Sequence, residues 1–340
     1  MGGRSQNGCA RCCIKFVQWL PVLFIVLIVA WSYYAYVYSL CIVLVTSIAV
    51  KIAFLIMYHI FLILFAWSYA KCILEEPLSP PREFLFTNED WELLHNVNSA
   101  ERDKSSIVEQ LVIKRNLPVY MVGNDGNINA CFTCGLIKPD RAHHCSTCGK
   151  CILQMDHHCP WTNNCVGFHN HKYFIVFLGW GAIYCFYIVA SSGPYFADFW
   201  TNTLGFLGDT DAQVNLPDFT GDLSVDRFQV MFLFIVAVMF GICQAGLGGY
   251  HVYLAARNQT TLETYAAPKF RNGPPDNRAF DVGRKANLQE MFGTNCCLAI
   301  LPVRTTLGDG VHWRYRSAPS DLPLLENGGH VSPVPLVNSF

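Results

Sequence analysis

Charge is the property that this sequence has least of. Only 14% of its 340 residues are charged, whereas 52% are hydrophobic, and the net charge is -1. Soluble domains usually carry about a quarter charged residues, so this composition indicates a bilayer protein rather than a large soluble core. The near-neutral balance, at a pI of about 6.8, offers no basic excess. We therefore expect no nucleic-acid partner.

The N-terminus lacks the features of a cleaved or lipidated leader. Its apolar run is too long for a signal peptide, and no small-residue cleavage site precedes a polar mature chain. Met1-Gly2 begins a poor myristoylation signal, because Gln6 stands where Ser or Thr is wanted. We therefore interpret the first apolar run as membrane-spanning.

Long apolar runs are what the sequence has instead of charge. Residues 16–74 are almost continuously apolar, which is too long for one span, since about 20 residues cross the hydrocarbon core. We predict two helices there, over 16–42 and 52–74, joined by a short turn. We predict a third helix over 173–199 and a fourth over 228–254. Four spans put both termini on the same side of the membrane.

Basic residues flank one set of the predicted helix ends. They include Arg4, Arg11, Lys15, Lys71, Lys172 and Arg257. The opposite loop, 200–227, contains several aspartates but no Lys or Arg before its last residue. By the positive-inside rule, residues 1–15, 75–172 and 255–300 are predicted to be cytosolic and 200–227 luminal. Lys51, in the short luminal turn, is an exception.

Cysteines concentrate in the long predicted cytosolic segment. Seven of the 16 lie between Cys131 and Cys165. Thiols stay reduced in the cytosol, so we expect this cluster to bind metal rather than to form disulfides. Its paired cysteines are separated by two intervening residues, which is metal-ligand spacing. Eight candidate ligands would close two tetrahedral zinc sites. They are Cys131, Cys134, His144, Cys145, Cys148, Cys151, His158 and Cys165.

Strand geometry separates neighbouring residues of this cluster. Adjacent side chains in an extended segment point opposite ways, so His144 and Cys145 would serve different metals. Likewise, one of His157 and His158 would face a metal and the other a cleft. The eight ligands fill both zinc sites, so Cys159 is not needed as a ligand. A membrane RING ligase would need a further cysteine pair downstream, and the sequence has none there.

These residues form a recognisable series. It runs Cys131-x₂-Cys134, then Lys138-Pro139-x-Arg141-x₂-His144-Cys145-x₂-Cys148-x₂-Cys151, then Asp156-His157-His158-Cys159-x₅-Cys165, with Asn170 and Phe174 beyond. The series closely resembles the cysteine-rich domain of the DHHC-family protein S-acyltransferases. Thr260-Thr261-Leu262-Glu263 resembles the TTxE motif of that family, and Asn287-x₄-Phe292-Gly293 resembles an element of its C-terminal region. The resemblance covers about residues 15–295.

The resemblance implies an α-helical integral membrane protein with four transmembrane helices. A cytosolic two-zinc domain, at about 129–172, would lie between the second and third helices. One zinc would be held by Cys131, Cys134, His144 and Cys151. The other would be held by Cys145, Cys148, His158 and Cys165. Both zinc ions would be structural.

The implied activity is that of a protein S-palmitoyltransferase. Cys159 would be the nucleophile, with His157 as its base and Asp156 orienting that imidazole. The co-substrate would be a long-chain acyl-CoA such as palmitoyl-CoA, and the acceptors would be membrane-associated proteins with cytosolic cysteines. Golgi membrane, or plasma membrane, is the usual location in the family.

Two pairs of residues are candidates for binding the co-substrate. Ser32 and Tyr184, polar positions within the first and third spans, would bound the far end of an acyl pocket; ordinary interhelical hydrogen bonding is the alternative. Lys138 and Arg141 would meet CoA phosphates, and Lys150 and Lys172 are further candidates. Anionic lipid headgroups are the alternative ligand for these basic residues.

The remaining segments carry weaker expectations. Residues 88–113 predict one short helix, with Asn88 as its cap. Thr261 and Glu263 would brace the catalytic domain, and Asn287 and Phe292 would anchor the C-terminal region, which packs on the catalytic domain. The tail 301–340, rich in Pro, Gly, Ser and Asp, is predicted to be disordered.

Three other cysteines lie beside the first predicted membrane helix, and two more lie in the C-terminal region. They are Cys9, Cys12, Cys13, Cys296 and Cys297. Self-acylation is one interpretation of these thiols, and small buried hydrophobic residues are the other.

A different class of function also has to be considered. A zinc-stabilised membrane adaptor would need the metal ligands but would have no need to spare Cys159. A transporter is a more distant third, since the predicted spans carry few charges suited to an ion path.

Overall fold

A computed structural model gives the structure of the chain. The described residues are 8–96, 101–208, 222–271 and 273–316. The chain forms two compact units, which we call the helical unit and the cysteine-rich unit. The helical unit comprises 1–71, 160–163 and 175–250. The cysteine-rich unit comprises 72–159, 164–174 and 251–340.

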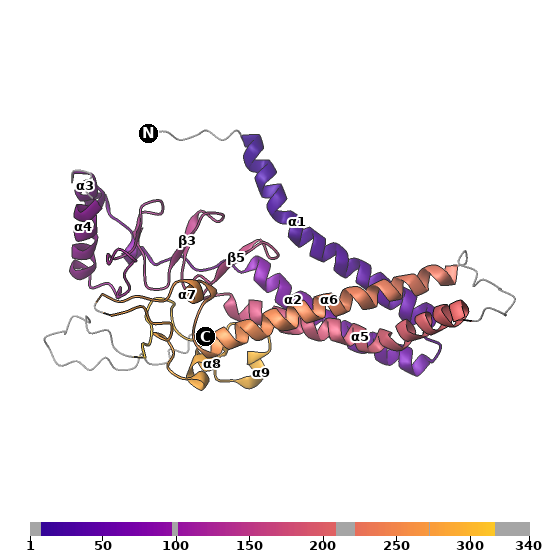
Figure 1. Cartoon of the computed structure of the whole chain (residues 1–340). Helices are drawn as coiled ribbons and strands as arrows, with labels where there is room; N and C mark the ends of the chain where they lie inside the picture. The colour runs from indigo at the N-terminus through magenta and orange to yellow at the C-terminus, as the bar shows by residue number, and fades with distance from the viewer. Residues whose placement is uncertain (1–7, 97–100, 209–221, 272, 317–340) are drawn as a thin grey trace. The chain divides into compact units, whose positions relative to one another are not determined.

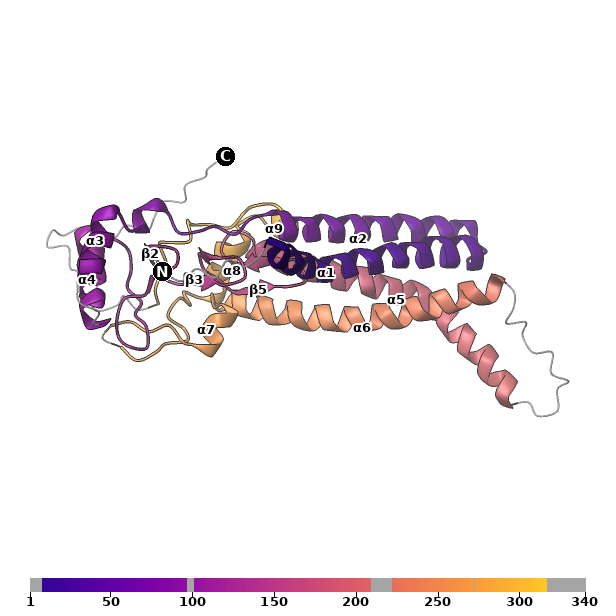
Figure 2. The ribbon, with the colours of Figure 1, turned by 90° about the horizontal axis from the view of Figure 1, so that it is seen from above.

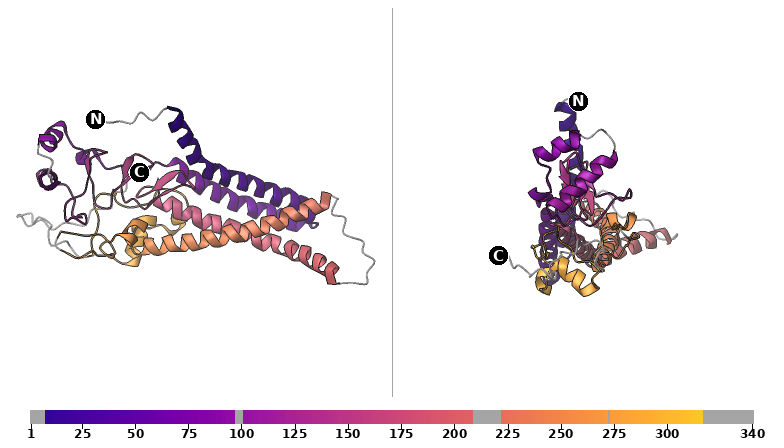
Figure 3. Two further views of the ribbon diagram at one scale, coloured as in Figure 1. Left: turned by 45° about the horizontal axis from the view of Figure 1, so that its top comes forward. Right: turned by 90° about the vertical axis from the view of Figure 1, so that its left-hand side faces the viewer.

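Four long helices carry the apolar runs. They are α1 (Gly8–Tyr33), α2 (Ile48–Leu74), α5 (His171–Gly208) and α6 (Asp222–Ala256). Figures 1 and 2 show them running alongside one another, and Figure 3 shows the same from a further side. The described residues contain four candidate spans, at Cys13–Leu44, Ile48–Leu74, His171–Thr201 and Val225–Ala256. The prediction of four membrane helices is therefore confirmed, and the helices are longer than predicted.

The first predicted helix has an unexpected second half. From Tyr34 to Leu44 it continues as a π-helix. The helical run ends before Val45, and α2 begins at Ile48, so the break is shorter than the predicted turn. The wider π-turn buries Tyr36 and Leu40 inside the helical unit.

Hydroxyl groups connect the helices of the helical unit. The Tyr36 hydroxyl donates to Ser191 Oγ at 2.9 Å, and Ser39 Oγ donates to Asp226 Oδ1 at 2.6 Å. The Tyr36 ring also stacks on Tyr58, with 4.2 Å between ring centroids. In lipid, apolar contact alone gives little preference for a particular helix pairing, so such polar contacts help to specify it.

Three short antiparallel hairpins build the centre of the cysteine-rich unit. The first pairs β1 (Ala130–Cys131) with β2 (Leu136–Ile137), the second β3 (His143–Cys145) with β4 (Lys150–Ile152), and the third β5 (His157–Cys159) with β6 (Asn164–Val166). Gly135 and Gly149 have φ values of +66° and +68°, one residue after the second cysteine of a CxxC pair. That left-handed conformation favours glycine and turns the chain so that both cysteines face one point.

The segment before the hairpins differs from the single helix that we predicted. It contains η2 (Arg82–Phe84), α3 (Asn88–Asn96) and α4 (Glu101–Lys114), and residues 97–100 lie outside the described part. Thr87, not Asn88, caps α3, because Thr87 Oγ1 accepts the Asp90 N–H at 3.3 Å and Asp90 Oδ2 accepts the Thr87 N–H at 2.6 Å.

The C-terminal region contributes to the core of the cysteine-rich unit. It forms α7 (Thr261–Tyr265), α8 (Arg284–Phe292) and α9 (Cys296–Ala299). The predicted disorder from 301 onward is wrong over residues 301–316, because Val311 and Trp313 are buried in the apolar cluster around Phe280. The Leu307 N–H also donates to the Glu290 carbonyl at 2.7 Å. Residues 317–340 of that tail lie outside the described part.

Candidate active site and metal centres

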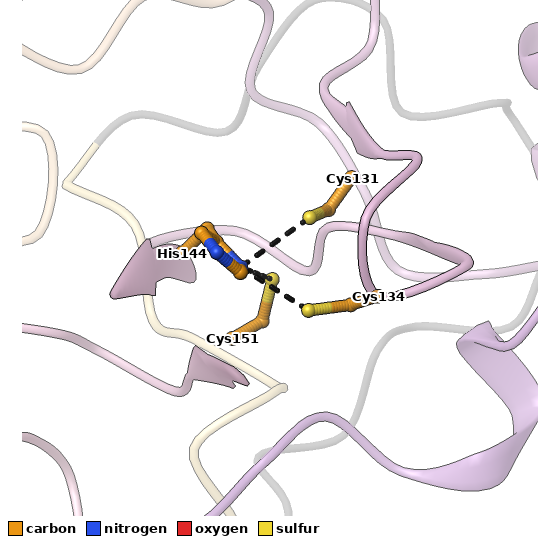
Figure 4. Close-up of side chains that lie close together, drawn as sticks. All are labelled: Cys131, Cys134, His144 and Cys151. Carbon is orange, nitrogen blue, oxygen red and sulfur yellow. Dashed lines mark hydrogen bonds between the residues drawn. The ribbon is translucent and has the colours of Figure 1, made fainter. Parts of the chain in front are cut away.

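The first cysteine and histidine cluster joins the first two hairpins. Cys131 and Cys134 come from the first hairpin, and His144 and Cys151 are directly opposed across the second. His144 Nδ1 lies 3.6 Å from Cys131 Sγ, 3.1 Å from Cys134 Sγ and 3.9 Å from Cys151 Sγ. Figure 4 shows the three thiols turned toward this ring. These are the four residues that the family resemblance implies for one zinc.

The second cluster joins the second and third hairpins. Its members are Cys145, Cys148, His158 and Cys165. His158 is directly opposed to Cys165 across the third hairpin. His158 Nδ1 lies 3.7 Å from Cys145 Sγ, 3.4 Å from Cys148 Sγ and 3.5 Å from Cys165 Sγ. His144 and Cys145, adjacent in β3, thus belong to different clusters.

Both clusters have the dimensions of a tetrahedral metal site. Zinc bonds of about 2.3 Å to sulfur and about 2.0 Å to nitrogen, at tetrahedral angles, put ligand atoms roughly 3.5–3.8 Å apart. The nitrogen–sulfur distances above, from 3.1 to 3.9 Å, lie around that value. Each cluster can therefore hold one metal ion.

Strand β5 sends its residues to two faces. His158 joins the second cluster, whereas His157 and Cys159, two residues apart, share the opposite face because strand side chains alternate. In the described part of the chain, neither four-residue cluster includes Cys159. The Cys159 thiol hydrogen-bonds to the His157 ring and is only 5% exposed. A thiol and an imidazole are thus paired beside the metal centres.

Asp156 holds the His157 ring from the other side. Asp156 Oδ2 lies 2.6 Å from His157 Nδ1, which leaves Nε2 for the thiol. Thr261, the first residue of α7, donates its N–H to Asp156 Oδ1 at 2.7 Å and its hydroxyl to Oδ2 at 2.9 Å. The carboxylate is fully buried, so these bonds fix its orientation. Thr261 thereby braces the candidate active site, as its place in the TTxE motif suggests.

The surroundings of Asp156 and His157 shift the pKa of each side chain. Burial alone would raise the pKa of Asp156, but the His171 and His157 rings and the Thr261 N–H lower it well below its usual range. Burial alone would lower the pKa of His157, but hydrogen bonds to Asp156 and Cys159, and their negative charge, raise it to about 9. The raised pKa of His157 and its contact with Cys159 suit this ring to take the proton of the thiol.

Two histidines that we did not single out complete this centre. His251 of α6 lies against His157, with 5.8 Å between ring centroids, and its Nδ1 is 3.4 Å from His171 Nε2. Phe174 contacts both His157 and His251, with centroids 5.2 and 5.1 Å away. Both additional histidines are buried. Buried ionisable residues in apolar helices mark functional sites, and that signal would have found them.

Arg141 does not fit the predicted contact with CoA. It is 2% exposed, and its guanidinium binds both Glu263 carboxylate oxygens, at 2.6 and 2.8 Å, and two oxygens of Asn258, each at 2.9 Å. The group also lies between the rings of Phe280 and Trp313, 4.2 and 4.5 Å from their centroids. No face of Arg141 remains for a phosphate, so its role is to join the hairpins to α7 and the C-terminal core.

The other basic candidates differ in how accessible they are. Lys138 is half-buried, and Lys150 lies 3.4 Å from Glu76 at the surface. Lys172 is buried and donates to the carbonyls of Leu298 and Val303, so it too is occupied by protein. Of the two residues that we favoured for CoA phosphates, only Lys138 stays a prediction.

The predicted acyl-pocket residues meet inside the helical unit. Ser32 Oγ lies 2.9 Å from the Tyr184 hydroxyl, which lies 2.7 Å from the Tyr58 hydroxyl. All three residues are buried. Their hydroxyl groups form a small hydrogen-bonded cluster, contributed by α1, α2 and α5, among apolar side chains.

Three further residues of the family resemblance, Asn287, Phe292 and Asn170, make contacts that hold the backbone in place. Asn287 Nδ2 donates to the Ala256 carbonyl at 2.9 Å and to Asp281 Oδ1 at 2.7 Å, so it fixes the chain after α6. The Phe292 carbonyl accepts the Thr305 hydroxyl at 2.6 Å. Asn170 bonds to the backbone of Cys165 and Gly167 just before α5.

Comparison with known proteins agrees with this site. The family model for DHHC palmitoyltransferase matches residues 124–267. Palmitoyltransferase ZDHHC20-A of Danio rerio is 42% identical over 318 residues, covering 94% of this chain and 83% of that protein. Palmitoyltransferase ZDHHC15 of Rattus norvegicus is 41% identical over 324 residues, covering 95% and 90%. Palmitoyltransferase ZDHHC2 of Danio rerio is 41% identical over 298 residues, covering 88% and 77%.

The match extends beyond the three hairpins to nearly the whole chain, including the four apolar helices and α7. An identity above 40% over such a length is far more than a shared metal-binding motif would produce. This chain belongs to the DHHC palmitoyltransferase family.

Proposed function

We propose that this chain is a protein S-palmitoyltransferase that works through an acyl-enzyme on Cys159. The observation that carries the proposal is the series Asp156, His157 and Cys159, in which the carboxylate binds one ring nitrogen at 2.6 Å and the thiol binds the ring. This is the arrangement of an activated nucleophile, with a base that is oriented by a third group.

In the first step His157 takes the proton of the Cys159 thiol. The thiolate attacks the thioester carbonyl of palmitoyl-CoA, the new sulfur–carbon bond forms, and CoA leaves as a thiolate that receives the proton. Asp156 stabilises the imidazolium that exists between these events. The raised pKa of His157, about 9, favours the charged ring at this stage.

In the second step a cysteine of a membrane-associated protein attacks the Cys159 thioester. His157 now accepts the proton of the incoming thiol, and Cys159 leaves and regains a proton. One thioester is exchanged for another in each step, so the transfer is close to isoenergetic and needs no nucleotide hydrolysis.

The two clusters are proposed to hold structural zinc. Three thiolates and one imidazole in tetrahedral array suit zinc, and a closed set of four protein ligands suits a structural site. Zinc, when bound, would cross-link the three hairpins. The chain's own contribution is to keep Cys159 on the face of β5 opposite His158.

The acyl-CoA co-substrate is proposed to contact Lys138 through its phosphates and the helical unit through its acyl chain. Burying about 14 CH₂ groups stabilises a 16-carbon chain by roughly 11 kcal/mol. Ser32 and Tyr184 would bound the far end of that chain, since their hydrogen-bonded hydroxyls are a polar stop among apolar side chains. Tyr184→Ala should then shift the preference toward longer acyl-CoAs, measured by competition between chain lengths. An unchanged preference would remove this role.

The membrane setting is proposed from charge and from the family. Both termini and the cysteine-rich unit would face the cytosol, where acyl-CoA and acceptor cysteines are found. Golgi membrane is the expected location, with plasma membrane as the alternative. Cysteine accessibility to a membrane-impermeant reagent would test the orientation.

The competing proposal is a zinc-stabilised adaptor without catalysis. Purified Cys159→Ser should lose hydroxylamine-sensitive labelling by palmitoyl-CoA and transfer to an acceptor peptide, while retaining about two zinc ions per chain. Cys243→Ser, which removes an exposed thiol of α6, is the matched control and should transfer normally. A wild-type chain that binds zinc but shows no labelling and no transfer would favour the adaptor. Transfer by Cys159→Ser at the wild-type rate would show that Cys159 is not the nucleophile.

A further inference from the structure

Two cysteines outside the active site are presented at the protein surface. Cys296 and Cys297 form the first half of α9, and both are exposed. Leu298 and Ile300 beside them are 38% and 57% exposed. The exposure of both thiols does not fit the interpretation of the pair as small buried hydrophobic residues. The surface here is a thiol pair continuous with exposed apolar side chains.

Specific contacts hold α9 in this position. Asn295 Oδ1 caps the helix by accepting the N–H groups of Cys297 and Leu298, at 2.9 and 3.3 Å. Gly293, at a φ of +79°, turns the chain before it, and a Cβ there would come within 2.8 Å of Thr305. The exposed thiols are therefore part of an ordered element.

Lys172 connects α9 to the beginning of a membrane helix. Its ammonium donates to the Leu298 carbonyl at 2.8 Å, the Val303 carbonyl at 2.9 Å and Thr305 Oγ1 at 2.6 Å. Lys172 is the second residue of the candidate span His171–Thr201. For the proposal below we take the membrane boundary to lie near Lys172, which would place α9 and its thiols beside that boundary.

We infer that Cys296 and Cys297 are S-acylation sites that receive their acyl group from the Cys159 acyl-enzyme of a second copy of this chain. The inference rests on the proposed function. A juxtamembrane cysteine flanked by apolar residues is a suitable acceptor, because the attached chain can enter the bilayer directly. Each buried CH₂ of that chain adds about 0.8 kcal/mol to membrane attachment. Leu298 and Ile300 begin this attachment before any acyl group is added.

The transfer is a thioester exchange. The thiol of Cys296 or Cys297 attacks the carbonyl carbon of the acyl group on Cys159 of the donor copy. The new sulfur–carbon bond forms as the bond to Cys159 breaks. The proton of the attacking thiol passes through His157 to the departing Cys159 thiolate. The proposal places the donor in a second copy of the chain, because the bonds to Lys172 hold α9 beside its own α5 and so limit its movement.

The test mixes two full-length chains in phosphatidylcholine vesicles. A tagged Cys159→Ser chain is incubated with palmitoyl-CoA, with or without an untagged active chain. Trypsin cuts after Lys285 and Arg304, and the peptide 286–304 contains Cys296 and Cys297 as its only cysteines. The tagged chain is recovered through its tag before digestion, and mass spectrometry of its peptide 286–304 should find at least tenfold more acyl group when the active chain is present. Equal amounts with and without the active chain would overturn the inference.

Two further variants test the membrane placement. Ile300→Asp in the tagged chain should lower acylation of peptide 286–304 at least fivefold, because the charge keeps α9 away from the bilayer. Thr294→Asp adds the same charge at an exposed position without removing an apolar contact, and acylation should stay within twofold. Equal losses in both variants would contradict the placement.

Failure of the inference can be told apart from failure of the proposed function. Peptide 151–172 of the active chain reports the Cys159 thioester in the same sample. If this peptide is acylated and 286–304 is not, the acyl-enzyme stands and the second site is wrong. If neither is acylated, both are wrong.

Discussion

Two hairpins of the cysteine-rich unit carry the same three residues in the same order. The second hairpin has His143-His144-Cys145 in β3, and the third has His157-His158-Cys159 in β5. In both, the middle histidine faces a metal cluster together with the cysteine directly opposed to it. The first and third residues nevertheless have different roles in the two triplets.

The difference comes from two neighbouring positions. Cys145 is followed three residues later by Cys148, and both join the second metal cluster. Thr162 stands at the same distance after Cys159. Ala142 precedes the first triplet, whereas Asp156 precedes the second. One triplet is thus completed by a second thiol and becomes structural, and the other is completed by a carboxylate and can become reactive.

The first histidines show the effect of that carboxylate. Burial, together with the positive charges of Lys138 and Arg141, lowers the pKa of His143. Asp156 and Cys159 outweigh burial at His157 and raise its pKa to about 9. Two imidazoles in equivalent strand positions thus have opposite shifts, and only the second is suited to take a proton from a neighbouring thiol.

The largest effect is expected from breaking the structural triplet. Cys145→Ser removes one of four ligands from the second cluster, and a structural zinc contributes on the order of 10 kcal/mol to folding. We expect the variant to lose about one zinc ion per chain and to unfold at a much lower temperature. Elemental analysis and thermal unfolding in detergent would measure this. Cys159→Ser, the same substitution in the other triplet, should change neither quantity.

The next effect is expected from making the third hairpin resemble the second. Asp156→Ala places alanine before both triplets, so His157 loses its orienting partner. General base catalysis contributes about 10²–10⁴-fold, and we expect acyl-enzyme formation to slow by an amount in this range. The rate would be followed by rapid quenching after addition of palmitoyl-CoA.

A matched control exists for that substitution. Asp309 forms a similar carboxylate–imidazole contact at the surface, with its Oδ2 2.7 Å from His312 Nδ1. Asp309→Ala should leave the rate unchanged. A slow rate in both variants, or in neither, would show that the comparison between the hairpins does not explain the reactivity of Cys159.

These arguments also show how far sequence could reach. Cysteine spacing and strand alternation predicted the metal clusters, because ligands that are close in sequence must converge locally. The four membrane helices followed from apolar length alone. Arg141 was assigned wrongly to CoA because its partner, Glu263, is 122 residues away, and a basic residue carries no local sign of being buried. The order of residues 301–316 was missed for a similar reason. Their composition is typical of disorder, but Val311 and Trp313 fill a core built by distant segments.

The pH dependence of alkylation should distinguish Cys159 from an ordinary thiol. The pKa of His157 is raised from 6.5 to about 9, so the ring stays positively charged up to about pH 9 and stabilises the Cys159 thiolate below that point. Iodoacetamide should modify Cys159 at a rate that changes little between pH 7 and 9. An ordinary thiol, with a pKa of about 8.5, would gain roughly tenfold per pH unit below that value.

The Asp156→Asn variant provides the contrast. It removes the charge that raises the pKa of His157, so the alkylation rate should fall at pH 7 and rise steeply toward pH 9. Mass spectrometry of peptide 151–172 would follow both proteins. A steep profile in the wild type would mean that the thiol is not activated in the resting state.

The smallest effect is expected one contact further out, at the residue that holds Asp156. Thr261→Val keeps the backbone N–H bond to Asp156 Oδ1 but removes the hydroxyl bond to Oδ2. One hydrogen bond contributes about 1 kcal/mol, so turnover should fall about fivefold, with KM for palmitoyl-CoA unchanged. Thr261→Ser keeps the hydroxyl and should restore the rate. Thr264→Val, which removes an exposed hydroxyl of the same helix, controls for damage to α7. If Ser fails to restore the rate, the hydroxyl is not what positions Asp156. The difference between the hairpins would then depend on the acidic residue alone, without its support from α7.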